Sequence, residues 1–157
     1  FDTKETILVK RLLQYFLPIK IRNRIINKLF KELVSKDLLS FSKKLYLNKK
    51  DILEMSSNGM DFGLHGNYHL WWEHQKIDII KKEIDKPIQF FNKITKKNKI
   101  FSLCYPYGSF NKKILSLVSK RNDISFALST RVNKISNKNL ITEKFFYPRF
   151  DANDFKK

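Results

Sequence analysis

The stretch "IFSLCYPYGSFNKKILSLVSKRNDISFALST", residues 100–130, decides the fold because it holds a strand, a helix and a second strand in succession. "IFSLCY" and "DISFALST" are apolar runs with the length of buried strands. Between them, "PYGSFN" has the composition of a turn, and "NKKILSLVSK" has helical spacing with a cap near Ser109 or Asn111. Two strands joined through one helix predict a parallel pair.

The same alternation continues on the upstream side. "KKDILEMSS", residues 49–57, predicts a short helix that Asn48 caps and Gly59 ends. "DFGLH", residues 61–65, then predicts a short strand.

A long helix is expected next, over about residues 74–94, because its isoleucines recur every three or four positions. Pro87 is expected to kink or split it, with Asp85 capping the second part. "FFYPRF", residues 145–150, is a further candidate strand. From Asn48 onward this order predicts an α/β fold with parallel strands, whose functional residues lie at the carboxyl ends of the strands.

The N-terminal part, residues 1–47, is predicted to be a helical segment separate from residues 48–157. Residues 5–17 and 19–34 each have an apolar helical face, and Pro18 interrupts them. Either the two helices pack as a hairpin, or they form a basic arm that contacts an anionic sugar, lipid or nucleic acid.

The composition is that of one basic domain with enough apolar residues for a core. The 157 residues carry a formal net charge of +17, but 26 of the 32 basic residues are Lys and only six are Arg. Since nucleic-acid readers use Arg forks, we expect Lys spread over a solvated surface and no nucleic-acid partner. No apolar run approaches the ~20 residues of a transmembrane helix. The chain starts at Phe1 and not at Met, so we expect a fragment, and an export signal upstream of it would not be seen. The lone Cys104 excludes an internal disulfide and fits a reducing compartment, so we expect a cytoplasmic protein.

The most unusual stretch is "MDFGLHGNYHLWW", residues 60–72, where His65 and His69 stand four apart. Neutral imidazole is the commonest metal ligand, but a catalytic zinc needs about three protein ligands. His65 ends one predicted strand and Tyr105–Gly108 follow the next, so both stretches should meet at one edge of the sheet. The residues alone leave open a metal site or two ordinary polar or core histidines.

Two of these motifs carry a resemblance to a known family. "GMDFGLHGNYH" resembles the His-(Ser/Thr)-x-x-His motif of the polysaccharide deacetylase family, the NodB-homology or carbohydrate esterase family 4 domain. "SLCYPYGSFN" resembles its Pro-Tyr-Gly motif, and "FYPRFDAND" resembles the domain end in members of surface-polysaccharide and lipopolysaccharide synthesis. The resemblance covers roughly residues 45–155. It implies part of a (β/α)7 barrel, with residues 1–47 as an insertion between the first and second motifs.

The resemblance also implies roles for individual residues. His65 and His69 would bind a divalent metal, typically zinc, and the main-chain N–H of Tyr107 would stabilise an oxyanion. The implied reaction is hydrolysis of an N-acetyl, or less often an O-acetyl, group on a sugar or polysaccharide, by a hydrolase of non-peptide carbon–nitrogen bonds. The expected substrate-contacting residues are Trp71, Trp72, Tyr105, Pro106 and Gly108, with Pro106 and Gly108 also fixing the turn. For the tryptophans and for Tyr105, simple packing is the alternative.

The chain departs from the family pattern at three places. The Asp-Asp pair that supplies the base and the third metal ligand is absent, so we expect it upstream of this sequence and expect the fragment alone to be inactive. The Arg that normally braces the base is replaced by Cys104, and Arg149 could substitute for it as a catalytic residue. The late Leu-x-His motif is absent, which leaves Asp151 or Asp154 as candidate acids.

These departures lead to a structural expectation and to two rival functions. We expect at most four parallel strands, with a gap beside the strand that ends at His65. The rivals to an enzyme are a carbohydrate-binding domain without catalysis and a basic nucleic-acid-binding domain.

Overall fold

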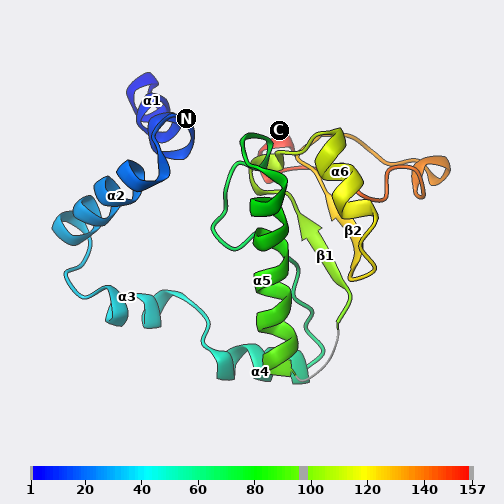
Figure 1. Ribbon diagram of the computed structural model, residues 1–157, viewed down its shortest axis with the longest axis horizontal. Coiled ribbons are helices and arrows are strands. Elements are labelled where there is room, and N and C mark those ends of the chain that lie inside the picture. Colours follow the sequence, from blue (N-terminus) through cyan, green and yellow to red (C-terminus); the bar gives the residue numbers. More distant parts are fainter. Residues whose placement is uncertain (1, 96–98, 156–157) are drawn as a thin grey trace. The chain divides into compact units, whose positions relative to one another are not determined.

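The computed structural model describes residues 2–95 and 99–155, which divide into two compact units, Phe1–Ile52 and Leu53–Lys157. The second unit contains the parallel pair that the sequence predicts (Figure 1). Strand β1, Phe101–Cys104, pairs with β2, Ile124–Leu128, with an irregularity between Phe101 and Ser102. Helix α6, Lys112–Ser119, connects them.

Helix α6 begins where the sequence supplies a cap. The side chain of Asn111 accepts hydrogen bonds from the N–H groups of Lys113 and Ile114, at 3.0 and 3.1 Å. This cap satisfies donors that have no partner inside the helix. Asn111, and not Ser109, is therefore the N-cap, and the helix buries Ile114 and Val118 against the core.

One further chain segment lies along each side of the strand pair. Leu64 bridges Leu103, and Tyr147 bridges Leu128, both in parallel. The predicted strands at 61–65 and 145–150 are thus wrong in extent, because each is a single bridge. Gly63 and Pro148 lower strand propensity in these segments. Within residues 2–95 and 99–155 the limit of four parallel strands is confirmed, and no bridge is present on the far side of Leu64.

Helix α5, Ile77–Thr95, packs on the sheet after a 3-10 turn, η2, at Trp72–His74. The predicted split at Pro87 is wrong, because one helix runs through it (Figure 1). The proline cannot donate to the carbonyl of Glu83, but the buried side chains of Ile84 and Ile88 hold the helix on the core.

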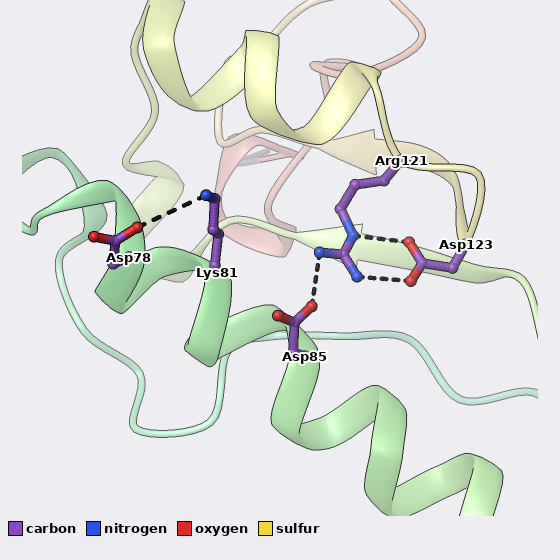
Figure 2. Close-up of polar contacts among 5 residues, drawn as sticks. All are labelled: Asp78, Lys81, Asp85, Arg121 and Asp123. Atoms are coloured by element: carbon purple, nitrogen blue, oxygen red, sulfur yellow. Dashed lines mark hydrogen bonds and ion pairs between the residues drawn. The ribbon is translucent and has the colours of Figure 1, made fainter.

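Asp85 caps no second helix and pairs with Arg121 instead. The guanidinium of Arg121 lies 2.7 Å from Asp85 and binds both carboxylate oxygens of Asp123 at 2.6 and 2.8 Å (Figure 2). These charge-assisted bonds connect α5 to the turn before β2. Asp78 and Lys81, also on α5, form a separate exposed pair (Figure 2).

The hydrophobic core lies entirely in the second unit. It is formed by α5, α6, the strand pair and the loops at their ends, with Trp72 and Tyr105 among its largest fully buried side chains. The core residues are Leu64, Leu70, Trp72, Ile80, Ile84, Ile88, Phe101, Leu103, Tyr105, Ile114, Val118, Ile124 and Ala127.

The first unit is helical but buries little. Helix α1, Lys4–Arg11, continues as a π-helical turn, η1, Leu12–Phe16, and Pro18 precedes α2, Ile19–Leu33. Neither α1 nor α2 buries a residue, so the predicted packed hairpin is not formed within the described residues.

Two more helices follow in the sequence. Helix α3, Leu38–Leu45, was not predicted, although Asp37 caps it through the N–H of Ser40. Helix α4, Lys49–Ser57, confirms its prediction, since the side chains of Asn48 and Asp51 accept hydrogen bonds from each other's N–H groups. No helix in the described part of the chain is long and apolar enough to cross a bilayer.

Candidate functional site

Three chain segments bring the candidate residues to the carboxyl edge of the sheet. His65 follows the bridge at Leu64, Tyr105 follows β1, and Arg149 follows the bridge at Tyr147. The Leu64 segment lies next to β1, and β2 lies between β1 and the Tyr147 segment. Residues far apart in sequence thus come to one edge of the sheet, as the parallel fold predicts.

The two histidines face each other through their Nε2 atoms, which are 2.9 Å apart. The Nδ1–H of His65 donates to the main-chain carbonyl of Cys104 at 2.9 Å. This bond places the proton on Nδ1 and leaves Nε2 of His65 unprotonated, with its lone pair facing Nε2 of His69. Two tetrahedral ligands at about 2.0–2.1 Å from zinc are separated by about 3.3 Å. A small increase in the distance between the two Nε2 atoms would therefore let both bind one zinc ion.

The environment of His69 favours its neutral form. Partial burial, and secondarily the neighbouring His65, lower the pKa of His69, while a main-chain hydrogen bond and the carboxylate of Glu83 act in the opposite direction. A metal ligand must be deprotonated. The lowered pKa therefore keeps His69 in the form that can coordinate a cation.

The turn after β1 has a strained main chain beside the histidines. Tyr107 has φ 58°, a left-handed value that is uncommon for a residue other than glycine and that clusters at functional sites. Its ring stacks on Trp71 with centroids 4.8 Å apart, and it lies edge-on to His69 at 4.5 Å. The direction of the Tyr107 N–H toward a substrate stays a prediction.

The residues on either side of Tyr107 fix this turn. A Cβ on Gly108 would lie 2.1 Å from Oγ1 of Thr130, so only glycine fits there, and its φ is 65°. The side chain of Pro106 is buried. Both residues therefore support the turn, and a contact of either with a substrate stays a prediction.

Tyr105 and Trp72 are fully buried, which favours the packing alternative for both, and a contact of either with a substrate stays a prediction. Tyr105 has no exposed surface, and its hydroxyl donates to the carbonyl of Phe145 at 2.8 Å. Burial strongly raises the pKa of Tyr105. Trp72 is also fully buried and lies edge-on to Tyr105. Of the aromatic candidates, Trp71 and Tyr107 keep partly exposed side chains.

Arg149 lies beside the position where the family pattern has an Arg. Its Nη1 atom is 3.1 Å from Sγ of Cys104, the residue that replaces that Arg. Arg149, Asp151 and Asp154 also line a cavity of about 360 Å³, which no histidine lines. The Asp154 carboxylate accepts a hydrogen bond from the N–H of Asp151 at 2.7 Å.

The sequence reasoning missed Glu83, the only charged side chain that is buried in the part of the chain that the structure describes. Its carboxylate contacts the loop between the two histidines. A signal was available, because Glu83 lies on the same helical face as Ile80 and Ile84. No group of three or more His, Cys, Asp and Glu that could hold a metal is found in residues 2–95 and 99–155.

Comparison with known proteins identifies the family. The sequence model of the polysaccharide deacetylase family matches residues 25–122. The chain belongs to the polysaccharide deacetylase family. The match begins within α2 and ends just before β2, so it includes both the histidine motif and the Pro-Tyr-Gly turn.

A solved structure shows the same fold. The Streptococcus pyogenes deacetylase PplD, in complex with acetate, has a TM-score of 0.57 and 24% sequence identity, over 66% of this chain and 43% of that chain. This polysaccharide deacetylase chain thus spans less than half the length of that structure. No curated protein matches the chain.

Proposed function

We propose that the chain carries the metal-binding histidines and the oxyanion turn of a metal-dependent carbohydrate deacetylase. The observation that carries the proposal is the His65–His69 pair, with its Nε2 atoms 2.9 Å apart beside the Pro106–Gly108 turn. Both features lie at the carboxyl edge of one parallel sheet, where such folds place their sites. We further propose that this sheet is part of a (β/α) barrel.

The histidine pair fits a divalent metal such as zinc by the chemistry of its donors. A bound zinc would polarise the acetyl carbonyl and lower the pKa of a water molecule. The carbonyl of Cys104 holds the tautomer and ring orientation of His65, as second-shell partners of metal-binding histidines do. The N–H of Tyr107 would donate to the oxyanion as negative charge develops.

The sugar ring would lie against Trp71 and Tyr107. Their stacked rings form a partly exposed aromatic surface next to His69. Residues 1–157 contain no Asp-Asp pair, so another part of the gene product would supply the base and the third ligand. Arg149, in contact with Cys104, would brace that base.

The test is acetate release from N-acetylated hexosamine oligomers by the full gene product supplied with Zn²⁺. We expect His65→Ala and His69→Ala each to lower kcat/KM by more than about 100-fold, because loss of a ligand exceeds the 10–100-fold cost of losing a second-shell partner. His74→Ala is the matched control, since His74 lies in η2 and is exposed. It should change activity less than about twofold.

The same experiment discriminates the carbohydrate-binding alternative. If the protein binds N-acetylated oligomers but releases no acetate from N- or O-acetyl sugars, the enzyme proposal is wrong. A loss of activity in His74→Ala equal to that in His69→Ala would also contradict it, because the effect would then be unspecific.

A further inference from the structure

We propose that Glu83 is a positioning residue that sets the separation of the two histidines by holding the loop between them. The inference rests on the proposed metal site at His65 and His69. It assigns a role to a side chain that lies outside both sequence motifs.

Glu83 binds the loop through two successive main-chain donors. Its carboxylate accepts from the N–H of Asn67 at 3.1 Å and from the N–H of Tyr68 at 2.9 and 3.2 Å. The side chain is only 2% exposed. A buried carboxylate is unfavourable unless hydrogen bonds compensate it, and successive N–H groups make a suitable anion site. These bonds are charge-assisted and therefore stronger than neutral ones.

The shape of the loop fits this carboxylate closely. A Cβ on Gly66 would lie 3.0 Å from Oε2 of Glu83 and 3.2 Å from Cγ of Pro106. Gly66 has φ 75°, and His69, at the other end of the loop, has φ 52°. Because His69 has a sparsely populated conformation, its surroundings must hold it there.

Helix α5 contacts the loop a second time. The ammonium of Lys86 lies over the ring of Tyr68, 5.1 Å from its centroid. The helix is itself fixed by Ile80 and Ile84, which are buried in the core. The loop is thus held by a rigid element.

The two histidines are therefore held by different elements. His65 is tied to the end of β1 through the carbonyl of Cys104. His69 follows directly on the loop that Glu83 ties to α5. The distance between the Nε2 atoms depends on both connections, so weakening the bonds of Glu83 should loosen one side of the pair.

The test uses Glu83→Gln in the full gene product, with Asp78→Asn as the matched control. Both variants remove one negative charge from α5. The side chain of Asp78, however, is 85% exposed and forms its ion pair in Figure 2 with Lys81. Two quantities are measured, the hydrogen exchange of the Asn67 and Tyr68 amides and the Kd for Zn²⁺ by calorimetric titration.

We expect Glu83→Gln to speed exchange at these two amides more than about 10-fold, while the core amide of Leu103 is unchanged. Since loss of a second-shell partner costs about 10–100-fold in metal affinity, the Kd for Zn²⁺ should rise by that factor. Asp78→Asn should change neither quantity. A role limited to general stability would instead speed exchange at Leu103 as well.

Gly66→Ala perturbs the same loop and leaves α5 intact, because alanine is unfavourable at φ 75° and its Cβ would crowd Oε2 of Glu83. We expect it to raise the Kd for Zn²⁺ and to speed the same two amides, and this variant decides the question if Glu83→Gln does not fold. The proposal is wrong if the folded variants keep the wild-type Kd for Zn²⁺ and the wild-type exchange rates of the Asn67 and Tyr68 amides. If the wild-type protein binds no Zn²⁺, the proposed function is wrong. In that case, faster amide exchange in Glu83→Gln that is confined to Asn67 and Tyr68 still supports the positioning of the loop by Glu83.

Discussion

The two units of the chain contain similar amphipathic helices, yet only one of them has a core. In the first unit, α1, α2 and α3 bury no residue, and many of their apolar side chains are exposed. In the second unit, α5 and α6 bury theirs against the strand pair. An apolar helical face thus predicts a helix, whereas burial of that face requires a second apolar surface to cover it.

The strand pair supplies that surface in the second unit. Phe101, Leu103, Ile124 and Ala127 are almost fully buried, so both strands contribute apolar atoms to the core. In the first unit, the ring contact between Phe30 and Phe41, with centroids 5.1 Å apart, links α2 to α3 without burying either helix. The two units should therefore respond differently to the same kind of substitution.

The largest contrast is expected for matched leucine truncations. Leu103→Ala, at a fully buried position, should lower the free energy of unfolding by about 2–5 kcal/mol, because it leaves a cavity. Leu33→Ala, at a position 78% exposed, should change it by less than about 0.5 kcal/mol. Urea unfolding followed by far-ultraviolet circular dichroism measures both, because helices of both units contribute to that signal. A cost of 2 kcal/mol or more for Leu33→Ala would show that this face of α2 is covered in solution.

An intermediate effect is expected at Tyr105 and should depend on pH. Tyr105→Phe should cost about 1–2 kcal/mol near neutral pH, because the carbonyl of Phe145 loses its buried donor. Burial raises the pKa of Tyr105 above the ordinary value of 10.0, so above pH 10 the unfolded chain loses this proton and the folded chain keeps it. The stabilisation is complete below pH 10 and is lost as the pH rises, by up to ~1.4 kcal/mol per pH unit.

The measurement for Tyr105 is the urea midpoint of wild type and variant between pH 8 and pH 11. The difference between the urea midpoints of wild type and Tyr105→Phe should become smaller as the pH rises. Tyr46→Phe, at a position of the first unit that is 70% exposed, is the control and should leave the midpoint unchanged. A gap that stays constant up to pH 11 would contradict the burial of the Tyr105 hydroxyl.

The smallest effects are expected for the helix caps, and they sharpen the contrast. Asn111→Ala should lower the stability of the second unit by about 1 kcal/mol, because α6 buries Ile114 and Val118. Asp37→Ala removes the cap of α3, which buries no residue. It should therefore reduce the helical character of the amide chemical shifts within α3 only. Amide chemical shifts and urea midpoints together measure these effects. If Asp37→Ala and Asn111→Ala shift the urea midpoint equally, α3 unfolds cooperatively with the second unit.

Local features of the chain were largely readable from the sequence. The caps at Asn48 and Asn111 and the parallel pair of strands follow from spacing, turn residues and apolar periodicity. The proximity of the histidine pair to the Tyr105–Gly108 turn follows from two motifs at the ends of neighbouring strands. Helix α3 was missed although Asp37 offered a cap for it.

Adjacent aromatic residues could not be separated in this way. Trp71 and Trp72 follow each other, yet only Trp72 is fully buried. Tyr105 and Tyr107 differ in the same manner, since the first enters the core and the second lies beside His69. Composition assigns both members of each pair the same preference. The direction of each side chain depends on main-chain angles in the turn, such as the left-handed φ of Tyr107.

Spacing and turn residues were enough to predict most helices, the parallel strand pair and the sheet edge that carries the histidines, because these depend on residues a few positions apart. The folded structure was needed to show that Glu83 reaches the loop between His65 and His69, that Arg149 contacts Cys104, and that α5 passes through Pro87 unbroken. Each of these depends on segments brought together by burial of a shared core. The free energy of that burial is a sum over distant residues that no local window contains.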